Sequence, residues 1–187
     1  MTLRIVAGAL KGRALASPKT DAIRPTSERH RGALFDIILH GQGLTIEGVR
    51  VLDLFAGTGA LGIEALSRGA VFGLFVEEGV EGRGLLRENV HALGLQGRTK
   101  IFRRDATSLG AAGTIEPFGL VLADPPYGRR LGERALGSAL AGGWLTPEAL
   151  CVLEEGRDAP FDLPQGFDLL DERVMGETAL RFLTPSR

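Results

Sequence analysis

The chain has 187 residues, 44% of them hydrophobic, and its 22 lysines and arginines almost balance 23 acidic residues. This length and composition predict one compact domain, 1–187, with a sizeable core. They exclude a membrane-spanning protein, because no apolar run approaches the roughly 18 residues that a span needs.

The N-terminal residues argue against a secreted protein, and the cysteine and histidines argue against a metal-binding one. The first residues are basic and mixed, without the apolar stretch of a secretory signal. The single cysteine, Cys151, cannot form an internal disulfide, and the three histidines show no metal-ligand spacing with it. We therefore expect a cytoplasmic monomer without metal and without membrane contact.

The chain begins with a basic segment. Residues 1–31 carry seven lysines and arginines against two acids, so the remainder is net acidic. Residues 3–15 have the pattern of a β-hairpin, and 1–25 are expected to form a basic extension. Such a segment indicates a phosphate-binding surface, although a solvated hairpin with ordinary charges is the alternative. The candidate RNA contacts in it are Arg4, Lys11, Arg13 and Arg24.

Alternating helix and strand patterns follow. Thr26 or Ser27 is expected to cap a helix that runs to about Leu39. Such alternation predicts a parallel sheet covered on both faces, and the chain is expected to end in a hairpin, 167–183. The expected elements lie at 50–55, 60–68, 71–77, 80–93, 99–103, 119–124, 131–141 and 149–154.

A glycine-rich turn connects the first of these strands to its helix. Ala56 to Gly62 fits the spacing G-x-G-x-x-G, and Glu77 ends the next strand about 20 residues on, where a ribose-binding acid belongs. This pattern also suits a nicotinamide dehydrogenase. However, Asp53 at the strand end would repel a pyrophosphate, and it suits a ligand with an ammonium group, such as S-adenosylmethionine.

Two more acids extend this candidate cofactor site. Glu78 competes with Glu77 for the ribose, because a one-residue shift of the strand end would exchange them. Asp105 follows another predicted strand and could accept a hydrogen bond from an adenine amine. The candidate cofactor-binding residues are Asp53, Phe55, Ala56, Gly57, Thr58, Gly59, Glu77, Glu78, Asp105 and Ala106.

The run Asp124-Pro125-Pro126-Tyr127 directly follows an apolar strand. The Asp124 carboxylate and the Pro125 carbonyl can each accept one N–H of a planar exocyclic amine. Pro126 stiffens the turn, and the Tyr127 ring offers a face on which a base can stack. The alternative is a proline-rich turn that merely ends a strand. Arg129 and Arg130, directly beyond it, are further candidate RNA contacts.

These motifs resemble known ones. Asp53 to Gly62 resembles motif I of class I methyltransferases, and Asp124 to Tyr127 resembles motif IV of those that methylate amino groups. The segments 4–8, 11–13, 24–29 and 34–38 resemble the RsmD family, and the likeness covers nearly the whole chain.

The resemblance implies the fold, reaction and partner. The expected fold is α/β, the Rossmann-like class I methyltransferase fold: a mostly parallel seven-stranded sheet with an antiparallel last strand, plus the N-terminal β-hairpin. The family transfers a methyl group from S-adenosylmethionine to the exocyclic N2 of guanine 966 in 16S rRNA. The partner is then 16S rRNA, within the small ribosomal subunit.

Other functions stay open. A DNA adenine-N6 methyltransferase would use the same pair of acceptors, but usually needs extra sequence to read bases. A protein glutamine methyltransferase typically has Asn in place of Asp124. A non-catalytic rRNA-binding assembly factor could keep both the fold and the basic segment.

Overall fold

The computed structural model describes residues 2–19 and 26–187. Arg24 and Pro25, part of the predicted basic segment, lie outside the described residues. Within the described ranges, no helix is both long enough and apolar enough to cross a membrane. The strands of the main sheet are β3 (Arg50–Asp53), β4 (Phe72–Val76), β5 (Thr99–Phe102), β6 (Phe118–Ala123), β7 (Leu145–Gly156), β8 (Phe167–Met175) and β9 (Thr178–Pro185).

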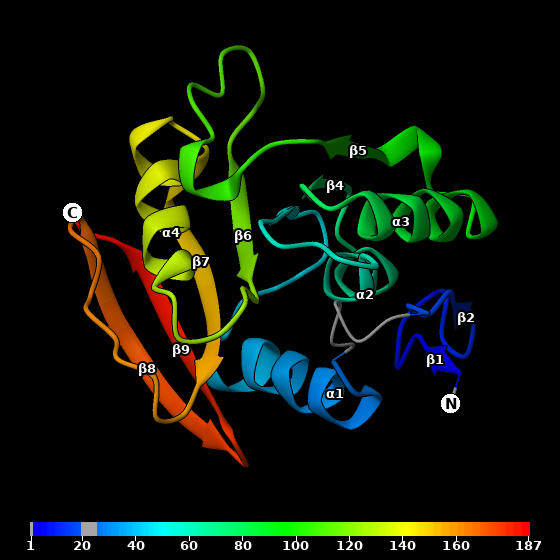
Figure 1. Cartoon of the computed structure of the whole chain (residues 1–187), viewed down its shortest axis with the longest axis horizontal. Helices are drawn as coiled ribbons and strands as arrows, with labels where there is room; N and C mark the ends of the chain where they lie inside the picture. Colours follow the sequence, from blue (N-terminus) through cyan, green and yellow to red (C-terminus); the bar gives the residue numbers. More distant parts are fainter. Residues whose placement is uncertain (1, 20–25) are drawn as a thin grey trace.

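These strands form one seven-stranded sheet in the order β5-β4-β3-β6-β7-β9-β8 (Figure 1). Strands β3 to β7 pair in parallel, whereas β9 is antiparallel to both of its neighbours, β7 and β8. The predicted Rossmann-like sheet with a reversed last strand is confirmed. The order reverses between β3 and β6, the place where α/β sheets open a crevice at their carboxyl ends.

The helices lie close to the predicted positions. Ser27 caps α1, because its side-chain oxygen accepts a hydrogen bond from the His30 amide at 3.1 Å. The sequence predicts that this helix runs to about Leu39. In the structure α1 ends at Asp36 and continues directly as a π-helical turn, η1. The helices are α1 (Glu28–Asp36), η1 (Ile37–Gly41), α2 (Ala60–Ser67), α3 (Val80–Ala92), η2 (Gln96–Arg98), η3 (Ala106–Ser108) and α4 (Leu131–Ala141).

Strand β7 begins earlier than the prediction of 149–154. The added part contains Pro147, which cannot donate a hydrogen bond to a sheet ladder. In the structure Phe118 pairs with Leu145 and Leu120 pairs with Leu150. The intervening residues of β7 form an irregularity that accommodates Pro147.

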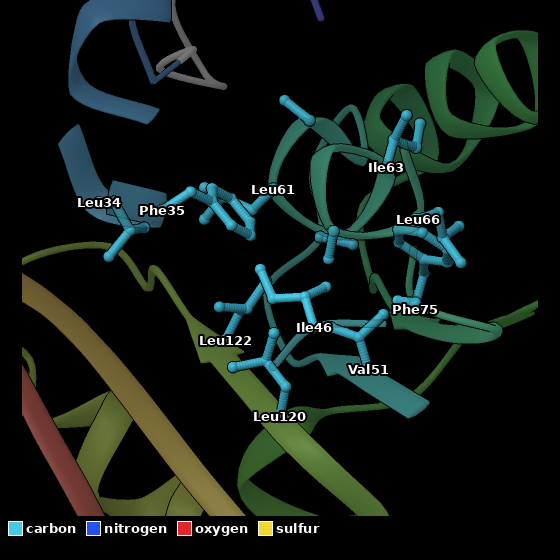
Figure 2. Packing of buried hydrophobic residues seen from close by; sticks show 14 of the residues in the cluster. Leu34, Phe35, Ile46, Val51, Leu61, Ile63, Leu66, Phe75, Leu120 and Leu122 are labelled. Carbon is cyan, nitrogen blue, oxygen red and sulfur yellow. The ribbon is translucent and has the colours of Figure 1, made fainter. Parts of the chain in front are cut away.

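Alternate residues of each central strand face two separate apolar layers. Leu120 and Leu122 of β6 pack on one face with α1, α2 and α3, while Val121 and Ala123 pack on the other face with α4. Figure 2 shows side chains of the first layer converging from α1, α2, β3, β4 and β6. The sheet is thus covered on both faces, as the sequence predicts.

The N-terminal segment folds as the predicted hairpin, with β1 (Leu3–Arg4) paired antiparallel to β2 (Ala14–Leu15). It lies beside α2 and α3 (Figure 1). The buried Glu64 carboxylate of α2 accepts the amides of Val6 and Ala7, each at 3.0 Å. Gly8 has a φ of 85°, and a Cβ there would lie 1.9 Å from the Ser67 carbonyl oxygen. The hairpin is therefore fastened directly to the body of the domain.

Arg31 of α1 completes this attachment. Its guanidinium donates to the Thr26 carbonyl at 2.7 Å and to the Arg4 carbonyl, and its Nε lies 3.7 Å from the Glu64 carboxylate. The side chain is fully buried, and this burial lowers its pKa from the ordinary arginine value. Arg31 counted toward the basic surface in the sequence, but the structure places it inside.

Candidate active site

A cavity of about 1030 Å³ opens at the carboxyl ends of β3, β4 and β6. This is a volume and a position typical of small-molecule sites in α/β sheets. The turns after these strands and the start of α1 contribute to its lining. Polar side chains around it come from Thr26, Ser27, His30, Thr58, Glu77, Glu78, Arg104, Asp105, Thr107, Asp124, Tyr127, Arg129, Arg134, Glu154 and Thr178.

The glycine-rich turn forms one wall of the cavity. Phe55, Ala56, Gly57 and Thr58 all line it, and Gly57 has a φ of 54°, which favours glycine. Gly59 does not line the cavity. A Cβ at Gly59 would lie 2.4 Å from a Leu86 methyl, so this glycine allows α3 to approach the turn closely.

The Glu77 side chain fixes the glycine-rich turn to the end of β4. One carboxylate oxygen accepts the Gly57 amide and the other accepts the Gly79 amide, both at 2.7 Å. The side chain of Glu78 is exposed, and its backbone carbonyl accepts a hydrogen bond from Arg83. Both glutamates line the cavity, but only Glu77 joins the glycine-rich turn to the end of β4.

Asp53 occupies a different place from the one expected. It does not line the cavity; its side chain is 1% exposed and accepts the Gly62 amide at 3.0 Å. Burial raises the pKa of the Asp53 carboxyl to about 7, against the opposing Gly62 hydrogen bond and with a further contribution from Glu77. In this arrangement the carboxyl supports the first turn of α2 rather than facing a ligand.

Asp105 and Ala106 also line the cavity. The Asp105 carboxylate accepts the amide and the hydroxyl of Thr107 at 2.8 and 2.7 Å. These two hydrogen bonds lower the pKa of the Asp105 carboxyl from its ordinary value. The carboxylate is therefore charged at neutral pH and remains exposed at the cavity edge.

The turn Asp124–Tyr127 also lines the cavity. The Thr26 hydroxyl donates to the Asp124 carboxylate at 3.1 Å, which links this turn to the start of α1. The Tyr127 hydroxyl donates to the Glu154 carboxylate at 2.9 Å. Pro125 is buried and Pro126 is exposed, and both line the cavity. The four predicted residues and the glycine-rich turn thus line the same cavity.

Several residues around the cavity were not predicted from the sequence. Glu154 of β7 and His30 of α1 lie together, with 3.1 Å between a Glu154 carboxylate oxygen and the His30 Nε2. Arg104 and Arg134 add positive charge to the lining. The only sequence indication was for Glu154, which directly follows the apolar run 149–153 at the predicted end of a strand.

The predicted RNA contacts are divided between two places. Arg129 lines the cavity, whereas Arg130 pairs with Asp162. Arg4 and Arg13 are exposed but also donate to backbone carbonyls, of Gly12 at 2.9 Å and of Ala92 at 3.0 Å. Lys11 is exposed on the hairpin. Arg24 lies outside the described residues.

Comparisons with known proteins match nearly the whole chain. Residues 3–184 match the family model described as "Conserved hypothetical protein 95". Ribosomal RNA small subunit methyltransferase D of Escherichia coli K12 is 35% identical over 181 residues, covering 96% of this chain and 88% of that protein. The chain belongs to the RsmD family.

Two further relatives agree. Ribosomal RNA small subunit methyltransferase D of Haemophilus influenzae is 31% identical, covering 96% of this chain and 92% of that protein. The solved structure of the putative methyltransferase yhhF from Escherichia coli superposes with a TM-score of 0.82 at 30% identity, covering 99% and 98% of the two chains. The RsmD family assignment makes the protein a methyltransferase, and it implies a methyl donor.

Proposed function

We propose that the protein transfers a methyl group from S-adenosylmethionine to the exocyclic N2 of a guanine in 16S rRNA, guanine 966. The observation that carries the proposal is that Asp124–Tyr127 and the glycine-rich turn line one and the same cavity. An amine-binding turn and a nucleoside-binding turn then face the same space. The names of the RsmD relatives support rRNA as the substrate.

The cavity residues fit S-adenosylmethionine. The turn at Gly57 has no side chain to obstruct a ligand, and no phosphate-binding side chain is needed for this molecule. Glu77 would hold the ribose hydroxyls, with Glu78 as the competitor, and Asp105 would accept from the adenine amine. Phe55, Ala56, Thr58 and Ala106 would line the same ligand. When bound, S-adenosylmethionine supplies a methyl group on a positively charged sulfur.

The Asp124–Tyr127 turn would bind the amine. A guanine N2 is a poor nucleophile, because its lone pair is delocalised into the ring. The Asp124 carboxylate and the Pro125 carbonyl would accept its two N–H groups and orient the remaining lone pair, and Asp124 would take the proton released. Tyr127 would stack on the base. The Glu155 carboxylate holds this turn by accepting the Gly128 amide at 3.0 Å.

The RNA would reach this cavity along basic residues on its rim. Arg129, Arg104 and Arg134 lie there, and Arg4, Lys11 and Arg13 are exposed on the hairpin. Since a guanine in a helix is stacked, the target base would be splayed out of a loop or bulge. We propose that a monomer acts in the cytoplasm on the small ribosomal subunit.

The test is a transfer assay with labelled S-adenosylmethionine and three substrates: small subunits lacking the modification, naked 16S rRNA, and DNA. Digestion to nucleosides identifies the methylated base. We expect N2-methylguanosine from ribosomal RNA and no label in DNA. Methylated adenine in DNA would replace the proposal with the DNA alternative. Cofactor affinity without transfer to any of the three would contradict the proposed reaction.

A further inference from the structure

Asp124 and Glu154 stand next to each other at the ends of neighbouring strands. Ala123 of β6 pairs with Leu153 of the parallel strand β7, so the following residues, Asp124 and Glu154, are in register. Neighbouring strands lie about 4.8 Å apart. Alternation places both side chains on the sheet face that α1 covers, and both line the cavity.

Each of the two acids meets a polar residue near the start of α1. Thr26 donates to Asp124, and His30 lies against Glu154. The two carboxylates therefore lie next to each other at the cavity. Together they can accept hydrogen bonds from more than one donor of a planar base.

One oxygen of Glu154 has no internal role in the described part of the chain. The residue is 5% exposed, and its Oε1 accepts the Tyr127 hydroxyl at 2.9 Å. Its Oε2 is buried and has no hydrogen-bond partner among the described residues. A buried carboxylate oxygen without a donor is costly, so such a group needs an explanation, and a ligand donor supplies one.

We propose that Glu154 accepts the N1–H of the target guanine and so selects guanine over adenine; this inference rests on the proposed function. In guanine, N1 carries a hydrogen and stands next to the N2 amine that Asp124 would hold. In adenine, N1 is an acceptor beside the exocyclic amine. A carboxylate at this position therefore attracts the first base and repels the second.

A purely structural role is the competing explanation. Glu154 would then serve only to hold Tyr127 and His30, and its loss would weaken transfer to any base equally. The two roles separate in a comparison of substrates that differ at N1 but keep the nucleophilic 2-amine. Guanine and 2,6-diaminopurine are such a pair, because the second has the 2-amine but no hydrogen on N1.

The experiment uses small subunits reconstituted on 16S rRNA that carries either guanine or 2,6-diaminopurine at the target position. Single-turnover rates with labelled S-adenosylmethionine are measured for the wild type, Glu154→Gln and Glu155→Gln. Glu155 is the matched control, a buried neighbour whose carboxylate holds the turn at Gly128 and does not line the cavity. Calorimetry with S-adenosylmethionine verifies that each variant is folded.

The wild type is expected to prefer guanine by about 10- to 100-fold, the usual range for one hydrogen bond to a charged group. Glu154→Gln should reduce this preference about tenfold or more, because its amide can also donate to the unprotonated N1. Glu155→Gln should slow both substrates by the same factor and leave the preference unchanged. Guanine and 2,6-diaminopurine also differ at position 6. That difference is the same for every variant, so it cancels when the preferences of the variants are compared.

Two outcomes overturn the inference: a wild type that does not discriminate between the bases, or a preference that Glu154→Gln leaves intact. If Glu154→Gln does not fold, Glu154→Asp takes its place, since its shorter carboxylate should also lower the preference. A wild type that fails to methylate even the guanine subunits contradicts the proposed function itself, which is a separate result.

Discussion

Two carboxylates that line the cavity, Asp124 and Glu77, have different surroundings. Asp124 contacts Thr26 beside the proline turn, whereas Glu77 accepts two amides at the glycine-rich turn. In the proposed reaction the first would serve the substrate and the second the cofactor. Single substitutions should therefore affect transfer and cofactor affinity separately.

Asp124→Ala should lower methyl transfer by about 100-fold or more, because the reacting amine would have no oriented acceptor at this position. Cofactor affinity should stay close to that of the wild type, since Asp124 belongs to the turn after β6, which would bind the substrate amine, and not to the glycine-rich turn. Calorimetry with S-adenosylmethionine and a transfer assay measure the two effects. Wild-type turnover in the variant would contradict the assignment of Asp124 to the amine.

Glu77→Ala should weaken S-adenosylmethionine and S-adenosylhomocysteine alike, by about 10- to 100-fold, because both carry the same ribose diol. Glu78→Ala is the matched control, and we expect it to change affinity little, since that side chain is exposed. Calorimetry gives both affinities. If Glu78→Ala weakens binding and Glu77→Ala does not, the ribose belongs to Glu78.

At the scale of elements, the hairpin and the sheet were predictable to different degrees. The strands and helices of the body follow from contiguous patterns, so their positions could be read from the sequence. The attachment of the hairpin could not, because it depends on Glu64 meeting the amides of Val6 and Ala7 from a distant part of the chain. The hairpin, residues 3–15, is consequently held against the body of the domain, and Arg4, Lys11 and Arg13 are exposed on it.

Replacing Arg4, Lys11 and Arg13 together by glutamine should weaken RNA binding and spare cofactor affinity. The slope of log affinity against log salt concentration should become shallower by about one for every phosphate contact that the variant loses. Binding isotherms at several salt concentrations measure this slope. Thermal unfolding serves as the control, because Arg4 and Arg13 also bond to backbone carbonyls.

An unchanged slope in this triple variant would mean that the hairpin does not meet phosphates. RNA binding would then belong to the cavity rim, where Arg129, Arg104 and Arg134 lie. Substitutions at these three arginines would test that second surface in the same isotherms.

For the whole molecule, the buried Asp53 links stability to pH. The pKa of its carboxyl is about 7 in the folded protein against an ordinary value of 3.8, because burial disfavours the charge. The folded state therefore holds a proton that the unfolded chain releases at lower pH. This contribution to stability is fully present below about pH 4 and is lost as the pH rises through 7.

Asp53→Asn keeps an acceptor for the Gly62 amide and removes the titration. Between pH 5 and 8, the unfolding free energy of the wild type should fall relative to that of the variant. Denaturant unfolding of both proteins across this range measures the difference. A constant difference at every pH would show that the Asp53 carboxyl does not titrate in this window.

The two turns that line the cavity could be placed from the sequence because their residues are contiguous. Gly57 and Asp124 belong to short runs whose spacing alone indicates a turn after a strand, and both turns line the cavity. Glu154 and His30 could not be found this way, since their meeting depends on the register of β7 and on the packing of α1. Asp53 was predicted to face a ligand, but a strand-end acid can equally turn inward, and only the fold distinguishes these positions.

The position of β9 has a consequence for how the protein is made. This last strand lies inside the sheet, between β7 and β8, although it is synthesised after both. Until Thr178 to Pro185 have left the ribosome, β7 presents an open edge and β8 has no strand to pair with. The sheet therefore cannot close before β9 is available, and a chain ending before Thr178 would expose two unpaired edges prone to aggregation.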